Sequence, residues 1–446
     1  GRNFIMEGIM RFIKNSVVIP LYNNEYLLIN TLLGLLDIIT EEEFAVVNQI
    51  KGYGEFRLEM LNKYDMPFIN QLMKRYYIMD SVVEAEWEKD LLSKLKEEDN
   101  FKKNHLDSVA FVLSYACNFA CPYCYEDSGS KSTNIMTQEQ VDIICSLHPE
   151  GIKKVLLFGG EPLLERNRSI IEYIVKKIPK AHYSVVTNGY YLLEFIDLLK
   201  NLNILNIQIT LDGDEDTHNK SRTLRNGGPT FVRILKGIEE GLKAGLRIKI
   251  RMNVTTDNIN SCLKLREKLF QKFNKNDNLI FEMQPVFQLE DNKKSELWNI
   301  LFEDVSLDYE KMATRNKILQ TFPAIINFFI NRNRITPIYH FCQLEEQNRY
   351  YDADGYIYSC ILAVGSHKKS IGTYYPQLTL KENSMATRNI ETIPECRQCS
   401  CKFLCGGGCS NGVADSENCF KPNCYNFKVE TSTMLPYIYS LLSGGK

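Results

Sequence analysis

The chain has 446 residues, 44% of them hydrophobic, which is enough for two or three domains with a large buried core. Its 53 basic and 55 acidic residues leave a formal net charge of -2, so no general basic field favours a nucleic-acid partner. No apolar run reaches the roughly 18 to 20 residues that span a bilayer, and no secretory signal pattern opens the sequence. We therefore expect a cytoplasmic protein without a membrane partner. In a reducing compartment, its 14 cysteines favour metal binding over disulfides.

The first hundred residues predict a small α+β module. Strand-like segments at 17–21 and 26–32 are joined at Asn23-Asn24, a plausible hairpin turn. Helical patterns follow at 40–50, 67–77 and 83–98, and Thr40 to Glu43 form a capping box before the first of them. Two strands and three helices suit a winged-helix-like domain over residues 1–105.

From residue 107 the pattern changes to strands and helices in alternation. The candidate strands are 109–115, 154–158, 182–187, 204–211, 247–254 and 279–286. The helical patterns between them are 137–147, 168–178, 192–202, 230–244 and 259–273. Six such repeats imply a parallel sheet with right-handed crossovers that curls towards a barrel. In such folds the chemistry lies at the C-terminal ends of the strands.

Three cysteines follow the first of these strands within eight residues. Cys117, Cys121 and Cys124 form a C-x3-C-x2-C run, and the next thiol, Cys145, falls in a helical pattern. Three soft ligands on one loop favour a metal site, but no neighbouring fourth thiol closes a tetrahedral zinc site. A four-iron cluster with one open iron fits better. A partial zinc knuckle, or three thiols without metal, is the alternative.

The spacing of this loop, with an aromatic residue before its third Cys, resembles the signature of radical S-adenosylmethionine (SAM) enzymes. The resemblance implies an α/β fold with a partial (β/α)6 TIM-like barrel over residues 106–286. It also implies that Cys117, Cys121 and Cys124 hold a [4Fe-4S] cluster whose open iron chelates the amino and carboxylate groups of SAM.

The same resemblance assigns further SAM-binding positions, in or after the Cys loop and near the ends of predicted strands. These positions are Tyr123, Gly159, Gly160, Glu161, Thr187, Thr210, Asp212 and Arg222. In the family, the aromatic residue lies near the adenine and the Gly-Gly-Glu segment holds the amino group. Thr210 and Arg222 match contacts to the ribose or carboxylate, and an Arg fork suits a carboxylate. The alternatives are an ordinary strand residue for Thr210 and a surface ion pair for Arg222. No catalytic acid or base is assigned.

Residues 287–340 form a charged and aromatic connector that is predicted to be mainly helical. Beyond it, the last hundred residues contain a second cysteine constellation. Its members are Cys342, Cys360, Cys396, Cys399, Cys405, Cys409 and Cys424. Their order and spacing resemble the SPASM domain, here over residues 341–446, which implies two auxiliary [4Fe-4S] clusters. A zinc ribbon that uses Cys396, Cys399, Cys405 and Cys409 is the alternative.

By the family's interleaved pattern, Cys342, Cys360 and Cys409 would bind the first auxiliary cluster. The second would be bound by Cys396, Cys399, Cys405 and Cys424. Sulfatase maturases supply a further Cys where this chain has Thr336, so the first cluster has an open iron, a non-Cys ligand, or another thiol such as Cys401 or Cys419. An open iron able to bind a substrate thiolate or amide would fit a thioether-forming enzyme.

Two further observations concern residues outside these sets. Sulfatase maturases carry an Asp general base where this chain has Ile361, which argues against a sulfatase-maturing activity. Cys145 and Cys262 fall in helical patterns and are predicted to be buried core residues.

Together these resemblances imply a radical SAM oxidoreductase with three [4Fe-4S] clusters and SAM. A 5'-deoxyadenosyl radical would take a hydrogen from a ribosomally made precursor peptide, and a thioether or carbon-linked crosslink would form while an auxiliary cluster accepts the remaining electron. The expected partners are this peptide and an external electron donor of the flavodoxin or ferredoxin type. Residues 1–105 would either recognise the leader of the peptide or shield the barrel edge.

Three alternatives come from other classes. The first is a sulfatase-type formylglycine maturase, and the second is a non-catalytic iron-sulfur electron-transfer protein. The third is a zinc-dependent interaction protein, for which a colourless preparation with zinc and no iron is expected.

Overall fold

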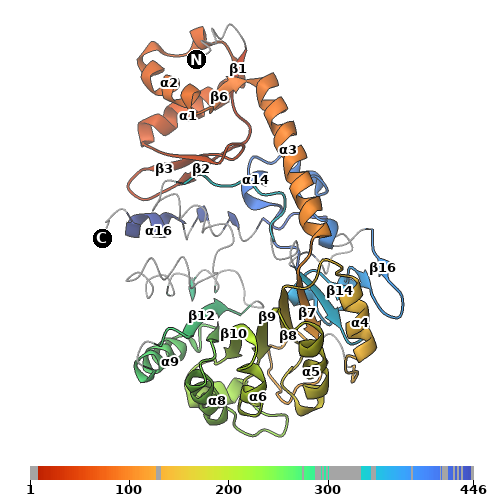
Figure 1. The fold of residues 1–446 in the computed structure, drawn as a ribbon. Helices are drawn as coiled ribbons and strands as arrows, with labels where there is room; N and C mark the ends of the chain where they lie inside the picture. The colour runs from red at the N-terminus through yellow and green to blue at the C-terminus, as the bar shows by residue number, and fades with distance from the viewer. Residues whose placement is uncertain are drawn as a thin grey trace. The chain divides into compact units, whose positions relative to one another are not determined.

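The computed structural model describes residues 9–126, 132–273, 276–286, 333–342, 348–382, 385–411 and 420–424, together with scattered positions at 293–300, 413 and 427–442. The chain divides into two compact units, each built from separate stretches (Figure 1). Unit 1 comprises Gly1–Phe101, Leu319–Cys342 and Arg388–Lys446. Unit 2 comprises Lys102–Ile318 and Gln343–Thr387.

Unit 2 is built on a ten-stranded sheet in the order β12-β11-β10-β9-β8-β7-β13-β14-β15-β16. Its first six strands in sequence are β7 (Ser108–Val112), β8 (Lys154–Phe158), β9 (His182–Thr187), β10 (Asn203–Thr210), β11 (Ile248–Val254) and β12 (Leu279–Pro285). They are all parallel, and each lies within about two residues of its predicted bounds except for the end of β7. The prediction of a partial, TIM-like parallel barrel is therefore confirmed.

The helices between these strands lie together on one side of the sheet (Figure 1). They are α4 (Gln138–Ser146), α5 (Arg168–Lys177), α6 (Leu192–Leu199), α7 (Glu215–Ser221), α8 (Phe231–Lys243) and α9 (Ile259–Lys272). Only α7 was not predicted, because its seven polar residues carry no apolar stripe. Asp214 begins α7 by accepting a hydrogen bond from the Thr217 amide at 3.1 Å.

The core of unit 2 lies between the sheet and these helices. In β11, Ile248, Ile250, Met252 and Val254 alternate along the strand and are each 0% exposed. Alternation places these side chains on one face of the sheet, where they pack with apolar residues of α6, α8 and α9. This burial holds the C-terminal ends of the strands, and the loops after them, in fixed positions.

A strand from the C-terminal part of the chain continues the sheet beyond β7. β13 (Asn348–Asp352) pairs in parallel with β7, and β14 (Tyr356–Tyr358), β15 (Gly372–Thr373) and β16 (Thr379–Leu380) follow as antiparallel strands. The segment 341–446, predicted as one domain, is therefore divided between the two units. The physical reason is that β13 covers the otherwise open edge of β7.

The N-terminal part of unit 1 contains two three-stranded sheets, with orders β5-β1-β6 and β2-β3-β4. The strands are β1 (Met10–Phe12), β2 (Ser16–Pro20), β3 (Tyr26–Asn30), β4 (Leu35–Ile39), β5 (Glu55–Phe56) and β6 (Ile78–Asp80). The predicted hairpin is confirmed as β2 and β3, and Asn23 and Asn24 have the positive φ angles of 61° and 56° that such a turn needs. The other four strands were not predicted, and three of these have only two or three residues.

Three helices complete the N-terminal module: α1 (Glu41–Tyr53), α2 (Met66–Lys74) and α3 (Ser81–Asn104). All three were predicted, and Thr40 with Glu43 forms the expected capping box of α1. The winged-helix-like character and the docking role of the module stay predictions.

The C-terminal part of unit 1 shares a core with the N-terminal module. Phe403 and Ile393 pack with Leu32 and Leu95 in one buried cluster, and the Thr31 hydroxyl donates to the Ser400 carbonyl at 2.8 Å. This part contains α14 (Lys402–Cys405) and α16 (Leu435–Leu442). The predicted helical connector, 287–340, falls largely outside the described residues. Within the described part of the chain, every helix is too short or too polar to cross a bilayer.

Candidate active site

The three-cysteine loop follows β7 at the C-terminal edge of the parallel sheet. Cys117 and Cys121 are half-buried and Cys124 is exposed, and all described cysteines are free thiols. Burial raises the pKa of Cys117 to about 12 and that of Cys121 in the same direction, and neighbouring thiols of the loop add to both shifts. The three sulfurs therefore lie close enough to act on one another. A bound metal would reverse the cost of ionising them, because it binds thiolates.

A Gly-Gly segment after β8 packs directly on the backbone that leads into this loop. The Gly160 amide donates to the Ser114 carbonyl and the Glu161 amide to the Ala116 carbonyl, each at 2.9 Å. A Cβ atom on Gly160 would lie 2.5 Å from the Ala116 oxygen, and one on Gly159 would lie 2.4 Å from the Ser114 oxygen. Both positions therefore require glycine for this close approach.

Glu161 joins the Gly-Gly segment to the end of β9. Its carboxylate is 0% exposed and accepts hydrogen bonds from the Thr187 hydroxyl at 2.6 Å, the Asn188 amide at 2.6 Å and the Leu163 amide at 2.8 Å. Burial raises the pKa of Glu161, and these three donors act in the opposite direction. The carboxylate therefore connects two strand ends, and the Thr187 hydroxyl, which also accepts from Gly189 at 3.0 Å, is held within the same network.

A second network links the Cys loop to the end of β10. The Tyr123 hydroxyl donates to Asp212 Oδ2 and accepts from Arg222 Nη1, the latter at 2.6 Å. Asp212 is 1% exposed, and its Oδ1 accepts from the Asn253 amide of β11 at 2.9 Å. Burial raises the pKa of Asp212, whereas Arg222 and Tyr123 act to lower it. Thr210, the half-buried last residue of β10, lies two positions before this carboxylate.

Arg222 is 8% exposed and is not the surface ion pair that the sequence left open. Its guanidinium lies 5.7 Å from the centre of the Phe119 ring and 6.0 Å from that of Tyr123. Its buried Nε atom has no hydrogen-bond partner among the described residues, and the same holds for Asn118 Nδ2 and Glu126 Oε1. Buried polar atoms without partners are costly, so they indicate a ligand that supplies them. Two donors and one acceptor around a thiol loop fit the amino-acid end of SAM bound at a cluster.

Sequence reasoning assigned no role to Asn118, Glu126 or Asn188. Asn188 Nδ2 donates to Asn118 Oδ1 at 2.8 Å and lies 3.8 Å from the Cys117 sulfur. Glu126 is 7% exposed, and burial, with the nearby Glu161 charge, raises its pKa to about 8. No local sequence signal marks Glu126, because its burial and its nearness to Glu161 depend on residues far apart in the sequence.

Four cysteines of the second constellation, Cys396, Cys399, Cys405 and Cys424, lie in unit 1 on a turn-rich segment with short helices. Cys396 and Cys405 are buried, and the pKa values of both are raised by burial and then by their thiol neighbours, which include Cys399 and Cys424. Cys401, whose role was left open, makes a hydrogen bond with Cys399 that lowers the pKa of Cys399 and raises that of Cys401. The predicted four-thiol set thus gathers in one place, and Cys401 adjoins it.

Three consecutive glycines allow this crowding. Gly406, Gly407 and Gly408 have φ angles of 61°, 84° and 73°, which side-chain-bearing residues rarely adopt. A Cβ on Gly408 would lie 1.8 Å from the Asn423 carbonyl oxygen, so only glycine lets the segment before Cys424 approach. Soft thiolates on close-packed backbone fit a four-iron cluster.

The other predicted auxiliary set is divided between the units. Cys342 and Cys409 belong to unit 1, whereas Cys360 belongs to unit 2, so this set stays a prediction. Of the cysteines assigned to the core, Cys262 is buried as expected and Cys145 is half-buried against the same core. Cys419 lies outside the described residues.

An acidic group beside β13 has a structural explanation. Ligand atoms of Asp352, Asp354 and His367 lie within 4.8 Å of one another. The buried Asp352 carboxylate, however, accepts from the hydroxyls of Tyr115 at 2.7 Å and Tyr358 at 2.9 Å and from two backbone amides. Its lone pairs are therefore already used to hold β13 and β14 against the end of β7.

The barrel region has relatives among known sequences. Residues 111–268 match the Radical SAM superfamily. A probable GTP 3',8-cyclase of Sulfolobus acidocaldarius is 31% identical over 155 residues, which are 34% of this chain and 49% of that protein. The chain therefore spans about half the length of this curated relative.

Two solved structures share the fold over more of the chain. Native anSMEcpe with bound AdoMet and Kp18Cys peptide has a TM-score of 0.53 at 19% identity, over 76% of this chain and 99% of that one. Streptococcus suis SuiB bound to the precursor peptide SuiA has a TM-score of 0.53 at 16% identity, over 93% of this chain and 99% of that one. At such identities the likeness concerns the fold. With the superfamily match over the strands that carry the thiol loop, it follows that this chain contains a radical SAM domain.

Proposed function

We propose that the chain is a peptide-modifying radical SAM enzyme of the SPASM type. It would abstract a hydrogen from a ribosomally made precursor peptide and form a thioether or another crosslink. The observation that carries this proposal is the presence of two separate thiol constellations, one at the C-terminal edge of the barrel sheet and one on the glycine-rich turns of unit 1. The fold likeness to two proteins solved with peptides supports the choice of substrate class.

A [4Fe-4S] cluster on Cys117, Cys121 and Cys124 would supply the electron that cleaves SAM to methionine and a 5'-deoxyadenosyl radical. The protein's part is to bind and orient SAM. Because Gly159 and Gly160 have no Cβ, their backbone can lie directly against the residues that lead into the Cys loop. A Cβ at either position would clash with those residues. Glu161 keeps this segment in place through its three hydrogen bonds and is not itself open to solvent.

The amino-acid end of SAM carries a carboxylate and an ammonium group. Arg222 offers a buried fork that is already aimed by its 2.6 Å bond to Tyr123, and its Nε remains available for a carboxylate oxygen. Asp212 keeps Tyr123 and Arg222 in position, because its carboxylate accepts a hydrogen bond from the Tyr123 hydroxyl and lies 3.9 Å from the Arg222 guanidinium. This network would let a ligand bind without reorganising the loop.

The thiols of Cys396, Cys399, Cys405 and Cys424 would hold an auxiliary cluster as a second redox centre. An auxiliary centre suits crosslink formation, because joining a carbon radical to a nucleophile leaves one electron that must be removed. The remaining set, Cys342, Cys360 and Cys409, would hold a further cluster, to make three in all.

The N-terminal module is proposed to recognise the precursor peptide, with shielding of the barrel edge as the alternative. Deletion of residues 1–100 would be a poor test, because Leu32 and Leu95 belong to the buried cluster that contains Phe403. A better test is photo-crosslinking of a candidate leader peptide to the intact chain, followed by identification of the labelled residues. Labelling confined to unit 2 would contradict the recognition role.

The decisive experiment is the iron and sulfide content of anaerobically reconstituted protein. Wild type is expected to hold about twelve irons, and the triple variant with Cys117, Cys121 and Cys124 changed to Ala about eight. Wild type should also release 5'-deoxyadenosine from SAM under reduction, and the triple variant should not. About four irons together with bound zinc would mean that the C-terminal thiols are structural, and the auxiliary centres would have to be abandoned.

Substrate trials separate the remaining candidates. A sulfatase-type formylglycine maturase would convert a Cys- or Ser-containing sulfatase peptide, although Ile361 stands where that class has its Asp base. GTP is a necessary second trial, because a probable GTP 3',8-cyclase is a relative over part of the chain. A non-catalytic electron carrier would release no 5'-deoxyadenosine.

A further inference from the structure

Two adjoining recesses open on unit 1 where the N-terminal module meets the cysteine-rich segment. The first, of about 520 Å³, lies between α3 and the turn after β1, and Glu391 and Gln398 close one side. The second, of about 530 Å³, lies between the same turn and the end of α1, with Ser400 in its wall. Arg11 and Lys14 line both, so the two recesses form one continuous surface.

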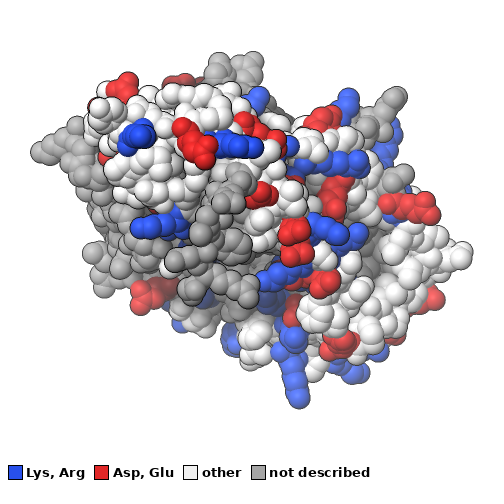
Figure 2. Space-filling model, turned by 90° about the horizontal axis from the view of Figure 1, so that it is seen from above, with Lys and Arg blue, Asp and Glu red and all other residues white. Residues whose placement is uncertain are grey.

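Four exposed lysines give this surface a local positive charge: Lys14, Lys51, Lys89 and Lys96. Among the described residues, none of them forms an ion pair with a carboxylate. Basic and acidic side chains are interleaved over the face shown in Figure 2, so unpaired lysines around one recess are a local feature. We call these four residues and the walls between them the basic recess.

The acidic residues of the walls are mostly engaged by the protein itself. Glu88 pairs with the buried ammonium of Lys402, and Glu391 accepts a hydrogen bond from the Tyr339 hydroxyl. Beneath the surface, the buried Glu84 carboxylate pairs with Arg11. Of the lining carboxylates, Glu55 alone remains without such a contact within the described residues. The Tyr339 hydroxyl is neutral, so Glu391 keeps its charge, as does Glu55. The four lysines outnumber these two carboxylates, and the recess is left with a net positive charge that a partner can neutralise.

The basic recess adjoins the thiol constellation of unit 1. Ser400, which lines the recess, has its hydroxyl 3.9 Å from the Cys401 sulfur, and Cys401 is hydrogen-bonded to Cys399. Lys51 is also a neighbour of these thiols: although the residue is exposed, loss of water around its ammonium lowers its pKa, and Cys401 acts in the opposite direction. A partner bound in the recess would thus contact Ser400, which is the residue between Cys399 and Cys401 in the sequence.

We propose that the basic recess is the docking surface for a small acidic electron-transfer protein that exchanges single electrons with a cluster on Cys396, Cys399, Cys405 and Cys424. The inference rests on the proposed function in one respect, because it requires that these four cysteines hold a cluster. In each exchange, the flavin or cluster of the carrier loses one electron and the auxiliary cluster gains it, or the reverse, and no covalent bond changes. An acidic peptide would need only the positive charge of the recess to bind. The thiols beside the recess are an additional feature that only a redox carrier would use, so they favour a redox carrier.

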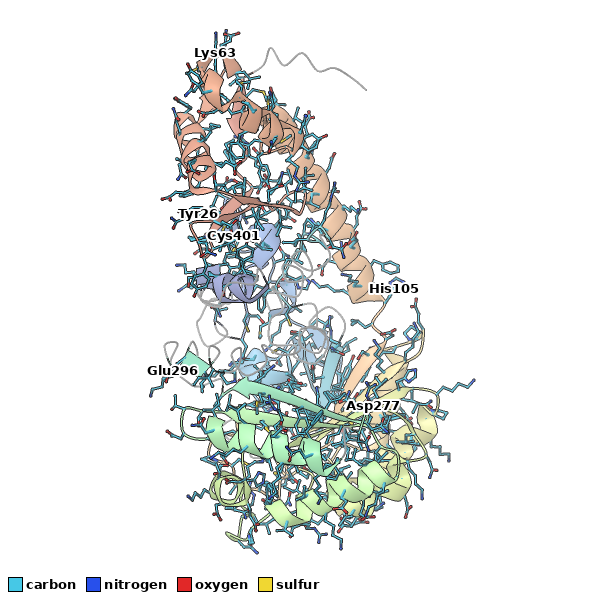
Figure 3. All side chains as sticks on the ribbon, turned by 90° about the vertical axis from the view of Figure 1, so that its left-hand side faces the viewer. Tyr26, Lys63, His105, Asp277, Glu296 and Cys401 are labelled. Atoms are coloured by element: carbon cyan, nitrogen blue, oxygen red, sulfur yellow. The ribbon has the colours of Figure 1, made fainter. Side chains whose placement is uncertain are left out.

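The test uses the full chain with Cys117, Cys121 and Cys124 changed to Ala, so that electrons can enter only through auxiliary clusters. Into it we would introduce Lys89→Glu with Lys96→Glu, and separately a control pair, Lys63→Glu with Lys94→Glu. The control makes the same change in net charge, and neither of its lysines lines the recess. Lys94 shares α3 with the test pair, whereas Lys63 lies at the far end of the same module from Cys401 (Figure 3).

Each protein is mixed with photoreduced bacterial flavodoxin in a stopped-flow instrument, and the oxidation of the flavin is followed. At low salt we expect the recess pair to lower the second-order rate constant about tenfold or more, and the control pair to change it by less than about twofold. The difference should vanish near about 0.5 M salt, because screening removes the attraction. Equal iron content and equal reduction by dithionite would show that the clusters are intact in all variants.

Three results would overturn the proposal. Equal slowing by both pairs would indicate a general charge effect. An unchanged flavodoxin rate in the recess pair, with loss of binding of a labelled poly-Glu peptide, would assign the recess to a peptide. If the parent protein oxidises no flavodoxin and holds zinc instead of iron, the auxiliary cluster itself is absent and the proposed function is contradicted. If the cluster is intact but the rate does not depend on the recess lysines, only the docking proposal is contradicted.

Discussion

Replacement of Gly160 by Ala tests whether the close approach of two backbones builds the SAM site. A Cβ at this position would lie 2.5 Å from the Ala116 oxygen and 2.6 Å from the Tyr115 oxygen, both belonging to the residues that lead into Cys117. Gly160 does not have a positive φ, so the substitution adds a clash without adding backbone strain. The effect of the contact can therefore be measured by itself.

The magnitude follows from the geometry. Ordinary van der Waals contact requires the carbonyls before Cys117 to retreat by roughly 0.8 to 1.5 Å. Because Gly160 and Glu161 also donate to Ser114 and Ala116 at 2.9 Å, such a retreat lengthens two hydrogen bonds. Overpacking of this kind costs about 1 to 3 kcal/mol. The local opening free energy of the segment should fall by that amount.

Hydrogen exchange measured by mass spectrometry over residues 108–126 is the appropriate assay. A loss of about 1 to 3 kcal/mol corresponds to exchange that is roughly 5 to 150 times faster. SAM binding to the reconstituted protein should weaken in parallel, because the loop has moved. The Gly52→Ala variant is the control: Gly52 lies in α1, nothing surrounds its missing Cβ within 4 Å, and alanine there should stabilise the helix by about 0.5 to 1 kcal/mol.

The reasoning would be refuted if Gly160→Ala exchanged at the wild-type rate and bound SAM normally. The Gly151→Ala variant separates the effect of backbone strain from the effect of a steric clash. Gly151 has a φ of 90° with open space around it, so alanine there introduces strain of about 1 to 2 kcal/mol without a clash. Its effect should remain local and leave SAM affinity unchanged.

Three further predictions concern the buried networks of unit 2. Arg222→Lys keeps the charge but loses the fork, so SAM affinity measured by calorimetry should fall at least about tenfold. The half-buried Arg233, which pairs with Glu194, is the control, and Arg233→Lys should leave the affinity unchanged. Glu161→Gln replaces one acceptor oxygen by a donor that faces Thr187 or Asn188, so unit 2 should lose about 1 to 3 kcal/mol in urea unfolding; wild-type stability would argue against the network. Burial, with a smaller effect of Arg222, lowers the pKa of His218 from 6.5 to about 3. The unfolded chain therefore binds this proton first, and stability that is complete above about pH 6.5 should fall by about 1.4 kcal/mol per pH unit below it. Because other groups such as Glu126, whose pKa is raised to about 8, titrate in both proteins, the measured quantity is the difference in unfolding free energy between wild type and His218→Gln. From urea unfolding between pH 7 and 5, that difference should follow this slope, and a difference that stays constant would contradict the prediction.

Several features of the chain could be read from the sequence because their signals are local. The six barrel strands are short segments between helical patterns, either nearly continuous apolar runs, as in β7, or alternating ones, as in β11, where one face packs on the helices. The cysteine spacings are local as well, since three thiols within eight residues must share one loop. The Asn23-Asn24 turn and the capping box at Thr40 depend on the backbone preferences of a few residues.

Only the tertiary structure decided how distant parts of the chain meet. β13 pairs with β7 across more than 200 residues, and no local pattern marks Asn348–Asp352 as the neighbour of Ser108–Val112. β5, with two residues, is too short for a periodic pattern, and partner strands in tertiary contact stabilise it instead. The mixing of N-terminal and C-terminal residues in unit 1 depends likewise on which apolar faces fit together.

The same distinction holds for the site. The sequence by itself determined which residue types are present and that they follow strand ends, and this was enough to indicate thiolate ligands and SAM. That Glu161 holds Thr187 and Asn188, that Tyr123 lies between Asp212 and Arg222, and that Glu126 is buried were decided by packing. The physical reason is that hydrogen bonds and burial depend on distances between residues far apart in sequence, which become defined only when the core has formed.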